Sequence, residues 1–151
     1  MKISTNIIWN RGEEENFLNG QYKRTHQWIM EGGMILNASA SPEIVPIPMS
    51  DPALIDPEEA FVSSVSSCHM LFFLSIAAKK KLVIDSYQDN PIATMGKNEN
   101  GKMAVKSITL QPKVVFGAGK KTDEATINRI HQIAHANCFL ANSINTKITI
   151  Q

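Results

Sequence analysis

The sequence has 151 residues, the length of one ordinary domain. Hydrophobic residues make up 43% of the chain and charged residues 19%, a composition that excludes an intrinsically disordered protein. The 15 Lys and Arg residues nearly balance the 14 Asp and Glu residues, and a net charge of +1 argues against nucleic acid or acidic lipid as a partner. We therefore expect a single globular domain over residues 1–151.

Cysteine content and apolar segments bear on where the protein resides. Two cysteines, Cys68 and Cys138, are too few for a secreted scaffold built on disulfides, and the polar N-terminus does not resemble a signal peptide. The longest apolar stretch, residues 61–78, contains five serines and a histidine, which favours a buried core helix over a membrane span. We expect a soluble cytoplasmic protein that does not bind membranes and whose thiols are kept reduced.

The N-terminal third reads as extended structure. Predicted strands cover residues 3–9, 21–30 and 34–39, with turns at Asn19-Gly20 and at residues 31–33. Four prolines between residues 41 and 55 predict an irregular, stiffened connection. A helix from Pro57 to Lys81 should follow, because Asp56 can cap it and Pro57 suits its first turn.

The second half alternates strands and a helix. Strands are predicted at residues 92–97 and 103–116, joined by a turn at 98–101 and followed by a loop at 117–121. A second helix is predicted from 122 to 137, and a last strand from 144 to 150. This order predicts an α+β fold with antiparallel sheets and two main helices.

Each cysteine taken alone is most simply a small buried hydrophobic residue. Cys68 lies three turns inside the first helix, where the helix dipole has faded, so its activation would require a cation from another part of the fold. His69 is a poor candidate for a catalytic dyad with Cys68, because adjacent residues do not share a helix face.

The segment from Asp56 to Phe61, with the small residues and Cys68 that follow, resembles the OsmC/Ohr family of thiol peroxidases. The family pattern places a cysteine ten positions after the first glutamate of an (Asn/Asp)-Pro-Glu helix start, as Cys68 stands after Glu58. A second cysteine, Cys138, follows 70 positions later, near the end of the second helix. Residues 141–143 and the last strand are also family-like, so the resemblance covers essentially the whole chain.

The resemblance implies a peroxidase that reduces organic hydroperoxides to alcohols on an intertwined homodimer. Cys68 matches the peroxidatic cysteine and Cys138 the resolving cysteine, which together form a disulfide. Glu58 matches a glutamate that orients an activating arginine, for which Arg24 is the first choice and Arg11 the second. A dithiol reductant, such as a lipoyl protein, would regenerate the thiols, and no metal or organic cofactor is needed.

Several alternatives stay open at the level of sequence. Phe139 follows Cys138 where the hydroperoxide-resistance branch usually has proline, which leaves the family branch and the preferred peroxide open. His131, His135 and Cys138 share one helical stripe and could bind a soft metal, although no fourth ligand is evident. The remaining alternatives on the same fold are a non-catalytic carrier of hydrophobic small molecules and a thiol redox sensor.

Overall fold

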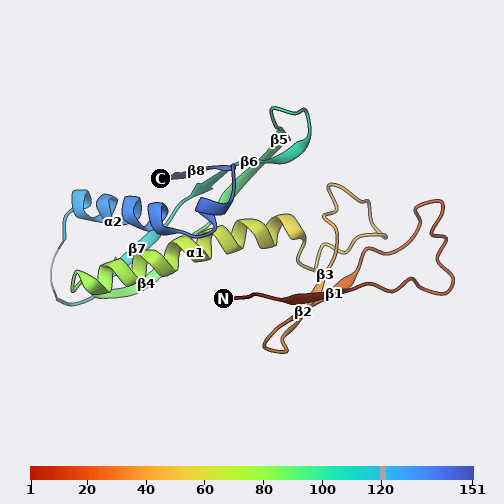
Figure 1. Cartoon of the computed structure of the whole chain (residues 1–151), viewed down its shortest axis with the longest axis horizontal. Helices are drawn as coiled ribbons and strands as arrows, with labels where there is room; N and C mark the ends of the chain where they lie inside the picture. Colours follow the sequence, from red (N-terminus) through yellow and green to blue (C-terminus); the bar gives the residue numbers. More distant parts are fainter. Residues whose placement is uncertain (120–121) are drawn as a thin grey trace. The chain divides into compact units, whose positions relative to one another are not determined.

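The computed structural model describes residues 1–119 and 122–151 (Figure 1). The chain divides into two compact units, residues 1–60 and residues 61–151, which are described separately. The first helix, α1 (Pro57–Lys79), begins in the first unit and continues through the second. Two helices and antiparallel-rich sheets confirm the predicted α+β class.

The first unit is built on a three-stranded antiparallel sheet. Its strands are β1 (Thr5–Ile8), β2 (His26–Met30) and β3 (Ile35–Ala38), with β2 in the centre. The predicted turn between β2 and β3 is present, with Gly33 at a φ of +85° that few other residues adopt. Residues 41–55 form no helix or strand, as their prolines predict.

Strand β2 is shorter than predicted. The Asn19-Gly20 turn is present, but the strand begins at His26 rather than at residue 21. The reason is a competing bond, since the Arg24 backbone N–H donates to the carbonyl of Met49 at 2.7 Å instead of to a neighbouring strand. Alternating side chains cannot reveal this bond, because its partner lies in the irregular segment.

Helix α1 begins with a reciprocal cap. The Glu59 N–H donates to the Asp56 carboxylate at 2.8 Å, and the Asp56 N–H donates to the Glu59 carboxylate at 3.3 Å. The helix ends at Lys79, two residues before the predicted end, and Lys81 takes a left-handed φ of +63°. The start of α1 therefore follows from its capping residues.

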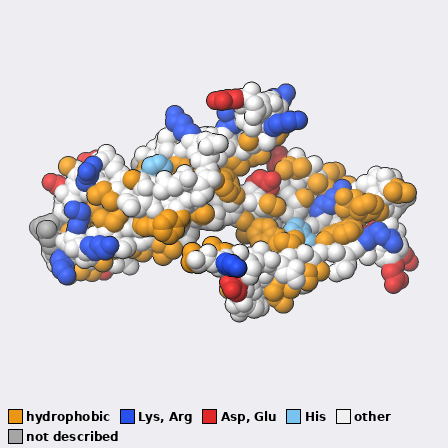
Figure 2. Space-filling model, in the orientation of Figure 1, with side chains coloured by type: hydrophobic (Ala, Val, Ile, Leu, Met, Phe, Trp, Pro, Cys, Tyr) orange, Lys and Arg blue, Asp and Glu red, His pale blue; other side chains and the backbone are white. Residues whose placement is uncertain are grey.

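Burial of α1 is less complete than the predicted buried core helix implies. Its buried residues form one stripe, Val65, Ser66, His69, Phe73 and Ala77, whereas Leu71 is 60% exposed. An 18-residue window of α1 has a mean hydropathy of 1.6, with 28% of it buried, so α1 could cross a membrane by length and composition alone. Core helices of soluble proteins pass the same test, which makes this weak evidence. Figure 2 shows apolar side chains at the surface among scattered charged groups of both signs.

The second unit contains two sheets. Strands β4 (Ile84–Gln88) and β7 (Lys113–Phe116) form one antiparallel pair. Strands β5 (Ile92–Lys97), β6 (Met103–Leu110) and β8 (Lys147–Ile150) form the other, in which β5 and β6 are antiparallel and β6 and β8 are parallel. The parallel pairing of β6 with β8 differs from the prediction of antiparallel sheets.

Two sequence predictions in this unit are corrected. The single strand predicted over 103–116 is two strands in different sheets, and β4 was not predicted. The break falls at Gln111-Pro112, where proline has no N–H for a sheet and the Gln111 N–H donates to Asp89 Oδ1 at 2.6 Å.

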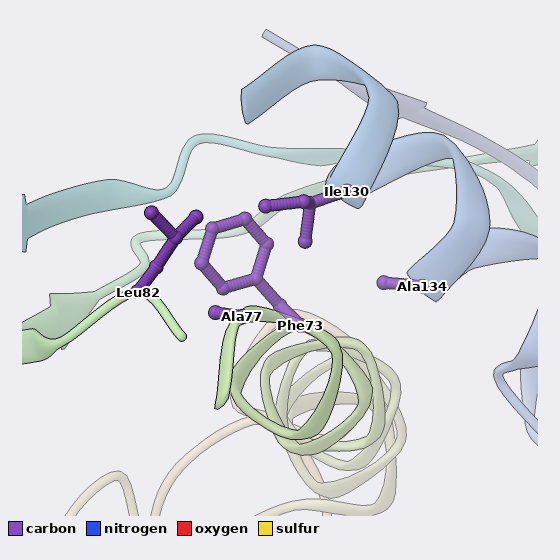
Figure 3. Packing of buried hydrophobic residues seen from close by; sticks show 5 residues of the cluster. All are labelled: Phe73, Ala77, Leu82, Ile130 and Ala134. Atoms are coloured by element: carbon purple, nitrogen blue, oxygen red, sulfur yellow. The ribbon is translucent and has the colours of Figure 1, made fainter. Parts of the chain in front are cut away.

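The second helix, α2 (Glu124–Asn137), is capped by Asp123, which accepts from the Thr126 N–H at 2.8 Å. A short 3₁₀ turn, η1 (Ala141–Ser143), leads to β8. Gly117–Gly119 form no regular element, as predicted, while Lys120 and Lys121 of that loop lie outside the described residues. Helices α1 and α2 pack through a buried apolar cluster (Figure 3). Its members are Phe73, Ala77, Leu82, Ile130 and Ala134.

Candidate active site

The second unit brings the two cysteines together from α1 and from the end of α2. Both are free thiols; Cys68 is half-buried in the middle of α1, and Cys138, 1% exposed, caps the C-terminus of α2. Turn η1 holds Cys138 in place, because the Asn142 N–H donates to its carbonyl at 3.0 Å and the Ala141 N–H points to its Sγ at 3.5 Å.

The two side chains lie close to each other in the second unit. Burial raises the pKa of Cys138, and the nearby Cys68 side chain raises it further, although the Ala141 N–H opposes this. Cys138 is therefore a protonated, enclosed thiol at neutral pH. Cys68 is the one of the pair that reaches solvent, so an incoming electrophile meets Cys68 first.

Arg24 lies in the first unit within a cluster of aromatic rings. Its guanidinium donates to the carbonyl of Gly20 at 3.0 Å and to that of Tyr22, and stands 3.5 Å above the centre of the Tyr22 ring. A recess of about 360 Å³ next to it is lined by Trp9, Phe17, Tyr22, Arg24 and His26. The guanidinium is thus preorganised by its own unit.

Arg11 and Glu58 complete the residues predicted from sequence. Arg11 donates to three carbonyls of its own exposed loop, those of Gly12, Glu13 and Glu15. Glu58 is half-buried in the first turn of α1, where a carboxylate is favoured by the positive end of the helix. Neither arginine has Glu58 among its described hydrogen-bond partners.

His69 pairs with a residue that the sequence interpretation did not connect to it. Its Nε2 lies 3.0 Å from Nδ1 of His131 on α2, and the two rings stack within 5° of parallel. Burial, and then the proximity of His131, lower the pKa of His69 to about 4, and burial also lowers the pKa of His131. The pair is therefore neutral at pH 7. The signal in the sequence was a lone polar residue in the apolar stripe 65, 69, 73 and 77.

The stripe of His131, His135 and Cys138, left open above as an alternative metal site, does not form one. His131 turns to His69, and within residues 1–119 and 122–151 no three His, Cys, Asp or Glu side chains are placed to hold a metal ion. Asp89, which was not singled out from the sequence, lies near the histidine pair and accepts from the Ser66 hydroxyl at 2.5 Å.

These features agree with the comparisons to known proteins. A model of the OsmC-like protein family matches residues 50–151, which include α1, both cysteines and every strand of the second unit. The chain belongs to the OsmC-like protein family. A solved OsmC-like protein of unknown function from Vibrio cholerae is 45% identical, with a TM-score of 0.98, covering 100% of this chain and 98% of that one.

More distant structures share the OsmC-like fold. An organic hydroperoxide resistance protein from Elizabethkingia anophelis is 13% identical with a TM-score of 0.71, covering 99% of this chain and 92% of its own. The protein OhrB of Bacillus subtilis, of the same description, is 14% identical with a TM-score of 0.66, covering 100% and 97%. At these identities the likeness concerns the fold alone. No curated protein sequence matches the chain.

Proposed function

We propose that this OsmC-like protein is a thiol peroxidase that reduces organic hydroperoxides to alcohols. The observation that carries the proposal is the pair of free thiols, one reaching solvent and one enclosed, that lie close together between α1 and the end of α2. Membership of the OsmC-like family supports it, since structural relatives include organic hydroperoxide resistance proteins.

The reaction begins at Cys68. Its thiolate attacks the terminal oxygen of the hydroperoxide, forming an S–O bond while the O–O bond breaks. The alkoxide leaves as an alcohol after taking up a proton, and the cysteine remains as a sulfenic acid. The peroxide is reduced by two electrons and the sulfur is oxidised by two.

Cys138 then resolves the sulfenic acid. Its sulfur attacks Sγ of Cys68 and loses its proton, the S–O bond breaks, and the hydroxyl leaves as water. Enclosure of Cys138 suits this role, because a buried protonated thiol reacts poorly with free peroxide but already lies beside the sulfur it must attack. A dithiol reductant returns both cysteines to thiols by two exchange steps.

In this proposal an arginine stabilises the Cys68 thiolate and the charge that develops on the leaving oxygen. Arg24 is the candidate, because the Tyr22 ring and two carbonyls already fix its guanidinium, and Glu58 would orient the same group. A homodimer, as the family resemblance implies, would cover Leu71 of α1, which is 60% exposed. A reducing compartment such as the cytoplasm would supply the dithiol.

Steady-state consumption of cumene hydroperoxide with dithiothreitol tests the proposal. The wild-type protein should turn over, whereas Cys68→Ser should be inactive. Cys138→Ala should react once and stop as a sulfenic acid. If dithiothreitol reduces that sulfenic acid directly, the rate of turnover of this variant should rise with the dithiothreitol concentration. Consumption by Cys68→Ser at the wild-type rate would overturn the assignment. No reaction in the wild type would favour the carrier on the same fold.

A further inference from the structure

The buried histidine pair joins the two helices that carry the cysteines. His69 is 1% exposed and His131 8% exposed, and their bond connects α1 to α2 across the interface. His69 is the residue after Cys68, and His131 lies two helical turns before Cys138. The chemistry proposed for the thiols uses neither imidazole. Burying two imidazoles has a cost in free energy, so the pair calls for another explanation.

The direction of the hydrogen bond follows from the other nitrogen of His69. Its Nδ1 is buried and has no hydrogen-bond partner among the described residues. An unpaired N–H is a rarer and costlier buried group than an unpaired acceptor, so Nδ1 carries the lone pair. His69 therefore donates its Nε2–H to Nδ1 of His131.

The surroundings keep the pair neutral and ordered. His135 on α2 and Asp89 after β4 are the other charged or titratable groups whose fields reach His69, and Phe73 packs on the His131 ring at 4.4 Å between ring centres. Tyr87 of β4 lies near Asp89 and packs on Phe73. Both Asp89 oxygens accept other bonds, from the Ser66 hydroxyl and from the Gln111 N–H. The carboxylate is thus engaged elsewhere, and the histidines bond to each other.

Apolar packing and a hydrogen bond constrain a helix pair differently. The contacts of Phe73 and Ala77 with Ile130 and Ala134 are non-directional and tolerate small sliding or rotation of one helix on the other. A hydrogen bond tolerates neither, since it weakens steeply with angle. A disulfide has equally narrow limits, with Cα atoms roughly 4.4–6.8 Å apart, so its formation depends on the register of α1 against α2.

We propose that the His69–His131 hydrogen bond is a positioning device that sets the register of α1 against α2 and thereby holds Cys68 and Cys138 ready to form a disulfide. The inference rests on the Cys68–Cys138 disulfide of the proposed function. It assigns a positioning role, because neither imidazole has a described hydrogen bond to a sulfur.

The test uses disulfide exchange and therefore needs no peroxide. The reduced protein is equilibrated with oxidised and reduced glutathione; two protein thiols and one oxidised glutathione give one protein disulfide and two reduced glutathiones. The equilibrium constant measures how well the fold presents the two sulfurs to each other. We expect it to fall about tenfold in His69→Met and in His131→Leu, the size of effect that one lost hydrogen bond can have.

Rescue variants separate the effect of the hydrogen bond from the effect of side-chain packing at the helix interface. In His69→Gln the amide Nε2 can donate as the imidazole Nε2 does, and in His131→Asn the amide Oδ1 can accept in place of Nδ1. Both should keep the equilibrium constant within about threefold of wild type. Ile130→Val is the matched control, because Ile130 belongs to the apolar cluster of the same interface and the change leaves both imidazoles in place. It should lower stability but not the equilibrium constant.

Three outcomes would overturn the inference. One is an unchanged equilibrium constant in folded His69→Met and His131→Leu, and another is an equal fall in Ile130→Val. The third is a nitrogen-15 spectrum of the wild-type imidazoles at pH 7 in which Nε2 of His69 and Nδ1 of His131 both carry a proton or both lack one, so that no hydrogen bond can join them. This result remains decisive if the apolar variants do not fold. Should the protein fail to reduce peroxides yet show the predicted equilibrium series, the positioning role would stand and the peroxidase proposal alone would fall.

Discussion

The contact between α1 and α2 has two halves of different chemistry. One is apolar, with Phe73 and Ala77 packed on Ile130 and Ala134, and the other is the hydrogen-bonded pair of His69 and His131. The apolar half supplies most of the stabilisation, since burial of a large side chain contributes about 1.5–3 kcal/mol. The polar half adds a directional hydrogen bond between the two helices and makes their contact sensitive to pH. A protein that had only to join two helices would have no need of the second half.

Removing the ring of Phe73 should have the largest effect. Phe73 is fully buried and touches the His131 ring as well as the apolar cluster. Phe73→Ala should lower the free energy of unfolding by about 3–5 kcal/mol, because it leaves a cavity as well as losing apolar burial. Chemical denaturation at fixed protein concentration measures this. A loss below about 1 kcal/mol would mean that the helices do not depend on this cluster.

Acid should weaken the polar half selectively. The pKa of His69 is about 4 in the folded protein against 6.5 for an ordinary histidine, so the unfolded chain binds a proton that the folded protein excludes. The stabilisation is complete above pH 6.5 and is lost as the pH falls from 6.5 to 4. The loss should reach about 2–3 kcal/mol.

The matched comparison for this pH effect is His69→Gln, which keeps the bond but cannot take up a proton at this position. Its free energy of unfolding should vary less between pH 7 and pH 4.5 than that of the wild type. The same slope in both proteins would show that another group is responsible for the acid sensitivity.

A smaller loss of stability is expected from removing the Ser66 hydroxyl, which lies near the histidine pair. The Ser66 hydroxyl donates to Asp89, whose other oxygen accepts from the Gln111 N–H between β6 and β7. Ser66→Ala should destabilise the protein by about 1–2 kcal/mol, since it removes a bond to a carboxylate in a partly buried site. Ser67→Ala is the control, because Ser67 is exposed on the same helix and its loss should be close to neutral. Equal effects of the two changes would contradict this view of Asp89.

Much of the fold could be predicted from local signals. Asp56 caps α1 as predicted, and the turns at Gly33 and Gly101 lie where the sequence placed them. Helix α2 begins two residues later than predicted, after its cap Asp123. The failures have non-local causes in part. The Arg24 N–H bonds to Met49, and the Gln111 N–H bonds to Asp89 where the strand past Leu110 breaks. Neither partner can be predicted from the segment itself, although Pro112 is a local signal for the second break.

In the candidate site, too, local patterns could be predicted from the sequence and contacts between distant residues could not. Spacing and resemblance singled out Cys68 and Cys138, and the structure places their side chains close to each other. The roles of Arg24 and Glu58 stay predictions. The bond of His69 to His131 could not be predicted, because its partners are 62 positions apart and only the packing of α1 on α2 selects one histidine of α2 over the other.

The most direct test of the central claim is the intact mass of the reduced protein after one equivalent of cumene hydroperoxide. The proposed chemistry predicts a loss of two hydrogens, which is the Cys68–Cys138 disulfide. Cys68→Ser should show no change, and Cys138→Ala should gain one oxygen. An unchanged mass in the wild-type protein would contradict the claim and leave the two thiols as packing residues of the helix interface.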